Sequence, residues 1–185
     1  MKKRLMFISL TLTLFLGTSG FAQDEKPKIP YVESGACPFE CCQYGTWTAE
    51  SPLVVYKKEV NDSAIVFRIK PRESFTAING NVHITKPGYV VLNKSYDGFT
   101  KGDKVYLLTY RGEGAYDLWY KGKMLDLNVL NLDEFWANVT EKDSPLYTWA
   151  VLIRRGDGKQ GWLRLKNSPK RAFWPEKIKG MDSCS

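Results

Sequence analysis

Short runs of apolar and alternating residues, separated by turn residues, recur along this chain from Gly45 onward. Runs of four to eight residues that are rich in Val, Ile, Tyr and Phe and are bounded by Gly, Pro, Asn or Asp are typical of β-strands. The third predicted strand ends at the turn Asn79-Gly80-Asn81. The strands predicted in this way span residues 53–56, 64–69, 74–78, 89–92, 104–110, 115–120, 148–155 and 161–165.

Two pairs of these strands are predicted hairpins, one with its turn at 111–114 and one with its turn at 156–160. Residues 130–140 are the one segment with helical character, and the character is weak. Seven to nine short strands with frequent glycine turns favour a small barrel or sandwich. The sequence therefore predicts an all-β fold.

The first 22 residues follow a different pattern. A basic start, Lys2 to Arg4, precedes an almost uninterrupted apolar run at 5–16 and then small residues up to Ala22. This order is typical of a secretory signal peptide that is cleaved after Ala22, and the run is shorter than the roughly 20 residues that span a bilayer. We expect export by the Sec route to the periplasm or the outside, with no transmembrane segment in the mature protein.

The mature chain is predicted to have three parts. Residues 23–43 form an extended, cysteine-containing N-terminal segment, 44–168 form the β domain, and 169–185 form a C-terminal tail tied down by Cys184. A chain of this length suits one domain or two very small ones, and it is long enough for a hydrophobic core.

The four cysteines lie in the mature part, three of them at positions 37, 41 and 42. An even number of cysteines in an exported chain indicates disulfides. Adjacent cysteines rarely bond each other. We therefore expect Cys41 and Cys42 to pair with Cys37 and Cys184, in one order or the other.

The formal net charge of +7 falls to +4 when the signal segment is removed, because 24 basic and 20 acidic residues remain. Most of these charges are scattered, except for a basic stretch towards the C-terminus at 166–179. This distribution favours a solvated surface over nucleic-acid binding.

Two stretches resemble the halves of a bacterial SH3-like (SH3b) domain. Residues 51–78 contain a short strand, a loop, a second strand and a turn leading to a third, with Pro71-Arg72-Glu73 in place of the family's glycine-bearing turn. Residues 149–165 contain a strand that opens on Trp149, a Gly-rich turn, and then Gly161-Trp162 on the next strand. About 70 residues lie between the two halves.

The resemblance implies an SH3-like small barrel with a large inserted β-hairpin region, or two interwoven SH3-like units. It also implies a non-catalytic role, because members of this family bind short peptides, commonly of peptidoglycan. We therefore expect an exported protein that binds a cell-envelope peptide or glycan. The alternative is an accessory or inhibitor module that binds an exported enzyme.

The hairpin at 104–120 is the predicted ligand site. Strand alternation places Tyr106, Leu108 and Tyr110 on one face, and an aromatic face turned to solvent would hold a peptide or sugar. A carboxylate at the Gly-rich tip would grip a cationic group of the ligand. The competing interpretation is that these rings pack in the core. The residues proposed for ligand binding are Tyr110, Glu113, Tyr116, Trp119 and Tyr120.

His83 is the sole histidine, which limits the catalytic and metal chemistry of this chain. A Cys–His hydrolase needs a free thiolate beside an aligned base, and a Cys₃His zinc site needs three thiolates. Disulfide pairing of the cysteines disfavours both. The sequence therefore predicts no catalytic residue, no metal and no cofactor.

Overall fold

The computed structural model describes residues 26–60, 63–167 and 178–184, and the predicted signal peptide lies outside these residues. Strands account for 55% of the structure and helix for 4%, which confirms the all-β prediction. No helix among the described residues is long and apolar enough to span a bilayer. The fold is barrel-like, with one strongly curled sheet and a second, smaller sheet.

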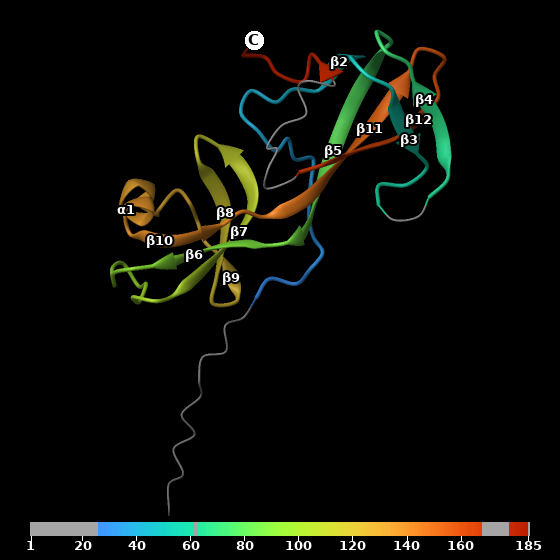
Figure 1. Cartoon of the computed structure of the whole chain (residues 1–185). Helices are drawn as coiled ribbons and strands as arrows, with labels where there is room; N and C mark the ends of the chain where they lie inside the picture. Colours follow the sequence, from blue (N-terminus) through green and yellow to red (C-terminus); the bar gives the residue numbers. More distant parts are fainter. Residues whose placement is uncertain (1–25, 61–62, 168–177, 185) are drawn as a thin grey trace, which may run out of the picture.

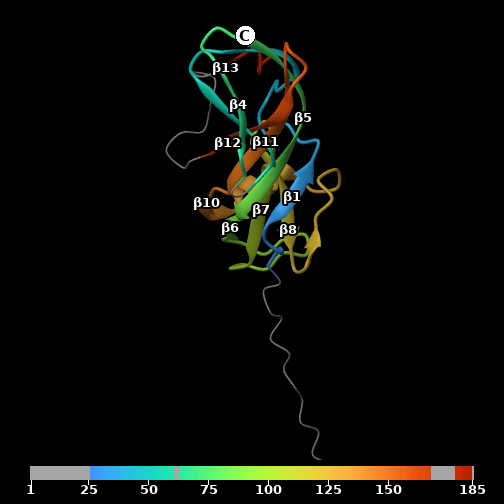
Figure 2. The same ribbon diagram turned by 90° about the vertical axis from the view of Figure 1, so that its right-hand side faces the viewer.

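The larger sheet has the strand order β13-β2-β5-β11-β12-β3-β4, and β1 pairs with β5 beside this path (Figure 2). All of its strand pairs are antiparallel. Its strands are β1 (Tyr31–Ser34), β2 (Gly45–Ala49), β3 (Leu53–Tyr56), β4 (Ile65–Ile69), β5 (Ser74–Lys86), β11 (Leu146–Arg155), β12 (Gln160–Lys166) and β13 (Ile178–Lys179).

The smaller sheet has the order β10-β6-β7-β8-β9 and is also antiparallel. Helix α1 (Leu132–Ala137) precedes the last strand of this sheet. Asn131 is its N-cap residue, and the side chain of Asn131 accepts a hydrogen bond from the backbone N–H of Glu134. Its strands are β6 (Gly88–Leu92), β7 (Lys104–Gly112), β8 (Ala115–Tyr120), β9 (Lys123–Met124) and β10 (Val139–Asp143).

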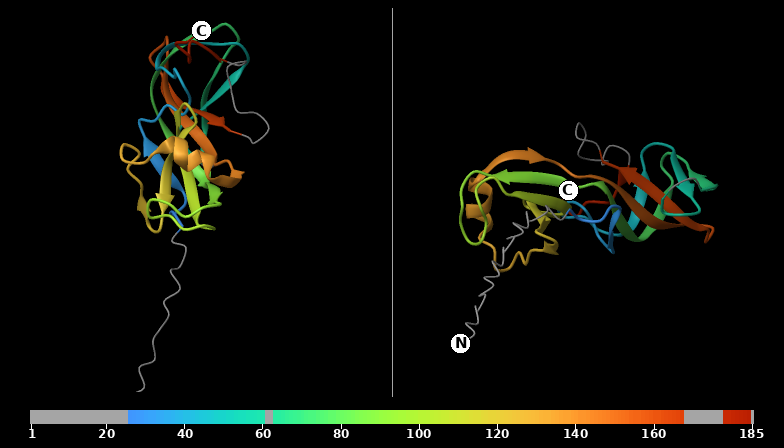
Figure 3. Two further views of the ribbon diagram at one scale, coloured as in Figure 1. Left: turned by 90° about the vertical axis from the view of Figure 1, so that its left-hand side faces the viewer. Right: turned by 90° about the horizontal axis from the view of Figure 1, so that it is seen from below.

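Two nearly continuous ribbons connect the sheets. One residue separates β5 from β6 and two separate β10 from β11, and the two ribbons lie side by side along their length (Figures 1 and 3). Gly88 stands at the junction, where a Cβ atom would lie 2.7 Å from the backbone N of Pro145. The segment between β5 and β11 thus forms the smaller sheet as an insertion into the larger one.

Each sheet has its own hydrophobic core. The larger core is centred on Trp47 and Trp149, which are fully buried with ring centroids 5.6 Å apart. The smaller core collects Leu107 and Leu118 around Phe135 of α1. Strand β7 contributes to both cores, because Leu107 faces the smaller one and Leu108 faces the larger one.

Strand β5 is longer than predicted. The expected turn at 79–81 is wrong, because β5 continues through it to Lys86. A Cβ atom on Gly80 would lie 2.5 Å from the indole nitrogen of Trp149, so this glycine makes room for a buried ring instead of forming a turn. Pairing with β11 supplies the backbone hydrogen bonds that the local sequence does not indicate.

The N-terminal segment is also more ordered than predicted. Residues 31–34 form β1, which pairs with 81–84 of the extended β5. Since its pairing surface exists only once β5 runs past Asn81, the strand was not recognisable from local pattern alone. The pairing of the cysteines is resolved as Cys37–Cys42 and Cys41–Cys184, within the two orders that the sequence allowed.

Candidate functional site

A row of polar side chains crosses the face of the larger sheet that is turned away from its core. Thr148 of β11 pairs with His83 of β5 on one side and with Lys166 of β12 on the other. The neighbouring row consists of Val82, Trp149 and Leu165, which are all buried in the larger core. Because side chains alternate along strands, the buried row fixes the polar row on the opposite face.

The described residues between β3 and β4 contact this polar row at several points. Glu59 Oε2 lies 2.8 Å from Nε2 of His83, whose side chain is largely buried. Arg164 donates from Nη2 to the carbonyl oxygen of Lys58 at 2.8 Å and to Oγ of Ser63 at 2.7 Å. These contacts hold the described parts of the segment against the sheet at two points.

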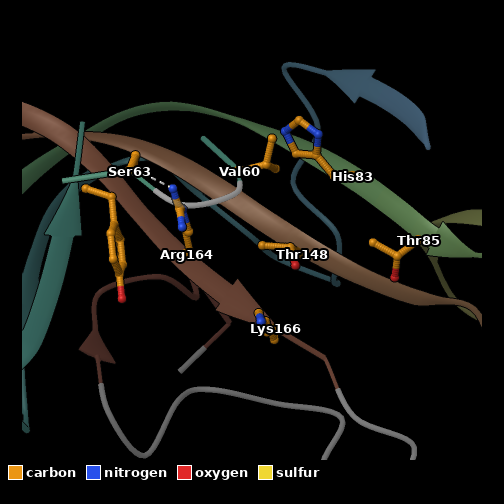
Figure 4. A pocket seen from close by; sticks show the side chains of 8 residues that line it. Val60, Ser63, His83, Thr85, Thr148, Arg164 and Lys166 are labelled. Atoms are coloured by element: carbon orange, nitrogen blue, oxygen red, sulfur yellow. Dashed lines mark hydrogen bonds between the residues drawn. The ribbon is translucent and has the colours of Figure 1, made fainter. Parts of the chain in front are cut away.

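A pocket of about 490 Å³ lies between this segment and the sheet (Figure 4). The volume is within the range of ligand sites, which is roughly 300–1,000 Å³. The guanidinium carbon of Arg164 lies 4.1 Å from the centroid of the Tyr56 ring, so a cation and an aromatic ring share one wall. We call this space the outer pocket, and its lining residues are Tyr56, Val60, Ser63, His83, Thr85, Thr148, Arg164 and Lys166.

The lining of the outer pocket is suited to binding. It offers two cationic side chains, an imidazole, the hydroxyl groups of one serine and two threonines, and a tyrosine ring, and none of its eight residues is acidic. Polar groups of these kinds can donate hydrogen bonds to the oxygens of a ligand, and an aromatic ring can pack against apolar or planar groups. His83 is held by Glu59, so the sole histidine has a partner inside the fold.

The five residues predicted for ligand binding do not form one groove. A register shift in the β7–β8 pairing, between Leu107 opposite Leu118 and Tyr110 opposite Tyr116, adds one residue to β7. Tyr110 therefore shares a face with Leu107, and the expected alternation of Tyr106, Leu108 and Tyr110 is wrong.

Tyr120 and Trp119 point to opposite sides of β8. Tyr120 is 8% exposed, packs on Phe99 at a centroid distance of 4.9 Å, and donates its hydroxyl to the carboxylate of Asp103. Trp119 packs against the larger core instead. Tyr120 therefore packs in the smaller core, and Trp119 packs against the larger one.

Tyr110 and Tyr116 remain together near the hairpin tip, with ring centroids 5.1 Å apart. Trp136 lies 6.3 Å from Tyr116, and Nζ of Lys142 lies above both of these rings. Burial raises the pKa of Tyr116, and the nearby Tyr110 adds to this effect. This set is partly buried and tightly packed.

Glu113 is exposed at the tip of the hairpin, with a φ of 49°. Its backbone N–H donates to the carboxylate of Glu40, and the hydroxyl of Tyr110 donates to the same carboxylate at 3.3 Å. Glu40 belongs to the loop closed by the Cys37–Cys42 disulfide. The tip is therefore fastened to the N-terminal segment.

The sequence analysis considered His83 for catalysis and metal binding, but it placed none of the residues of the outer pocket in a ligand-binding site. Arg164 and Lys166 do alternate with Leu163 and Leu165, which is a local signal for a polar outer face on β12. His83 gave no such signal, because the predicted strand ended before it. The segment that covers the pocket is positioned by contacts between residues about 100 positions apart, which no local pattern encodes.

All four cysteines are engaged in disulfides. Cys41, Asp182 and Cys184 bring their ligand atoms within 4.8 Å of one another. The two sulfurs are bonded to each other, however, and a metal site requires thiolates. His83 is engaged with Glu59, so the Cys₃His arrangement considered from the sequence is not assembled.

Comparisons of the chain with protein-family models, with curated proteins and with solved structures found no match. The function of this chain is therefore inferred from its own residues.

Proposed function

We propose that this chain is an exported, non-catalytic binding protein of the SH3-like type, and that it recognises a peptide or glycan of the cell envelope in the outer pocket. The observation that carries the proposal is the pocket itself. Strands β3, β5, β11 and β12 and the segment that follows β3 bring an aromatic ring, hydroxyl groups and cations to one concave place. Pockets with a few convergent polar groups are the usual form of a ligand site.

The disulfides support an extracytoplasmic location for this binding role. Both bonds use cysteines of the mature chain, and disulfides persist in oxidising compartments. They also leave none of the four cysteines as a free thiol. A Cys–His hydrolase would need such a thiol, which favours binding over hydrolysis.

A test of this proposal uses the mature protein and insoluble peptidoglycan at low and at moderate salt. We expect retention at both salts, because a built pocket depends less on long-range charge than a basic surface does. Replacing the exposed Thr85 by Trp should fill the pocket and weaken retention by about tenfold or more, which corresponds to about 1.4 kcal/mol. Sedimentation with the polymer measures the bound fraction.

Thr140→Trp is the matched control. Thr140 is also an exposed strand residue whose hydroxyl donates to a backbone carbonyl, that of Val91, as the hydroxyl of Thr85 donates to that of Leu146. It lies on β10 of the smaller sheet, so this variant should bind as the unchanged protein does. Equal retention of both variants would contradict the pocket as the site, and retention at low salt alone would indicate charge attraction.

A protein partner is the second candidate, and one observation favours it. Strand β4 is at the end of the larger sheet, where it pairs with β3 among the described strands. Ile65 and Val66 on this strand are 49% and 42% exposed. An edge strand with exposed apolar side chains suits strand addition by another protein. Failure of the mature protein to bind peptidoglycan would favour this role as an accessory or inhibitor module.

A further inference from the structure

We propose that the outer face of the larger sheet, beside the outer pocket, binds an acidic polysaccharide whose sugar rings pack on Trp162 and whose carboxylates pair with Arg68 and Arg154. None of these three residues lines the outer pocket. This second surface is therefore additional to the proposed function and does not depend on it.

An apolar row crosses the outer face of three neighbouring strands. Leu152 of β11 is the cross-strand partner of Trp162 on β12, and Trp162 is the partner of Tyr56 on β3. The adjacent row on the same strands is buried in the larger core and consists of Val151, Leu163 and Val55. Because side chains alternate along strands, Leu152, Trp162 and Tyr56 point away from that core. All three are half-buried, so part of each side chain stays exposed.

Trp162 is the centre of this apolar row. The ring of Tyr56 has the guanidinium of Arg164 above it, at 4.1 Å from its centroid. Among the residues that the structure describes, no aromatic ring or cation stacks on the indole of Trp162 in the same way. An aromatic face packs well against the C–H groups of a sugar ring, because the face is negative and those groups are apolar with a weakly positive edge.

An arginine stands on either side of the apolar row. Arg154 is two residues after Leu152 on β11. Arg68 of β4 is the partner of Val54, which is two residues before Tyr56 on β3. Both arginines therefore share the outer face with the row, and both are exposed.

Neither of these arginines has a carboxylate partner in the part of the chain that the structure describes. Arg111 and Arg155, in contrast, each lie against an aspartate. Four acidic residues in the larger sheet and its turns already have basic partners, namely Glu50, Glu59, Glu73 and Asp157. A ligand carboxylate would give Arg68 and Arg154 the paired, bidentate partner that suits a guanidinium.

The charge of this half of the molecule favours an anionic partner. Residues 45–60, 63–86, 146–167 and 178–184, which form the larger sheet apart from β1, contain 12 basic and 5 acidic residues. Residues 88–143, which form the smaller sheet and its helix, contain 7 basic and 9 acidic residues. The fold thus gathers in one sheet an excess of positive charge that is scattered along the sequence, and a polyanion complements it.

An acidic polysaccharide suits this surface better than another polyanion does. Its sugar rings present apolar faces between carboxylates, which matches an indole between two guanidinium groups. Single-stranded nucleic acids also combine stacking groups with anions. The two disulfides, however, indicate an oxidising compartment outside the cytosol, where acidic polysaccharides are the polyanions at hand.

The test measures binding of the mature protein to three soluble probes of matched length by isothermal titration calorimetry. The probes are oligogalacturonate, its neutral methyl ester, and oligo-dT. We expect oligogalacturonate to bind at least about tenfold more tightly than the ester, because the ester keeps the sugar rings and removes the carboxylate charge. Oligo-dT should bind more weakly than oligogalacturonate.

Variants locate the binding surface. The double variant Arg68→Gln/Arg154→Gln changes two exposed side chains and should weaken binding of oligogalacturonate about tenfold or more. Lys94→Gln/Lys123→Gln is the matched control, because it removes the same charge from two exposed positions within 88–143, and it should change the affinity by less than about twofold. In NMR spectra the indole N–H signal of Trp162 should shift on titration, while that of Trp136 on α1 should not.

Equal affinity for oligogalacturonate and its ester would overturn the inference, and this comparison needs no variant. An equal loss of affinity in the two double variants would also overturn it, because it would indicate attraction to the overall charge. Tighter binding of oligo-dT would contradict the polysaccharide, and an unshifted Trp162 signal would contradict packing on that ring. Failure of the proposed function is a different result, namely equal peptidoglycan retention by Thr85→Trp and Thr140→Trp.

Discussion

Replacing Trp149 by Ala is expected to lower the free energy of unfolding by about 3–5 kcal/mol, the range for large aromatic side chains removed from a core. Trp149 is fully buried and packs on Phe39, Tyr44 and Trp47. Its indole nitrogen donates to the carbonyl oxygen of Ala36 at 3.0 Å. The change therefore removes the central ring of the larger core and its connection to the N-terminal segment. Urea denaturation measures the loss.

Two further variants separate ring packing from the hydrogen bond. Trp149→Phe keeps most of the ring and should cost less, because Ala36 still accepts the hydroxyl of Tyr44 at 2.7 Å. Trp162→Ala removes a half-buried ring from the paired strand β12 and should cost less than Trp149→Ala. A loss below about 1 kcal/mol for Trp149→Ala would contradict the role of this ring as the centre of the core.

Removing the Cys41–Cys184 disulfide is expected to cost about 5 kcal/mol in the chain-entropy model, because it closes a loop with a sequence separation of 143. The bond also holds the chain end beside β2, where Ile178 and Lys179 pair with Ala49 and Thr48. The double variant with Ser at both positions tests this by comparing its denaturation midpoint and m-value with those of the unchanged protein.

The Cys37–Cys42 bond is the matched control, since its sequence separation is five and the same model assigns it about 2 kcal/mol. Replacing this pair with Ser should therefore destabilise the protein less. A larger loss from the short loop than from the long one would contradict the entropic account. It would indicate that the bond acts mainly by placing Phe39 on the ring of Trp149.

The strands were the most predictable part of this fold. Runs such as 53–56 and 115–120 have both apolar patterning and turn residues on their flanks, so local sequence specifies them. Strand β5 was cut short in the prediction because Asn79-Gly80-Asn81 has the composition of a turn. In the structure, pairing with β11 and the bulk of Trp149 override that local preference.

The candidate site was much less predictable than the strands. Aromatic residues drew the sequence analysis to the β7–β8 hairpin, but a single register shift redistributes them over two cores. The outer pocket depends on cross-strand register and on a segment held by Glu59 and Arg164. The cross-strand register and the position of this segment cannot be recognised from a short stretch of sequence, because both depend on contacts between distant parts of the chain.

The most direct measurement for the proposed site is an amide-shift map of the isotope-labelled mature protein titrated with a soluble digest of peptidoglycan. The outer pocket predicts that the largest shifts occur at His83, Thr148 and Lys166, while residues around Tyr116 stay nearly unchanged. Shifts confined to the hairpin around Tyr116, or no shifts at saturating digest, would contradict the assignment of the outer pocket as the ligand site.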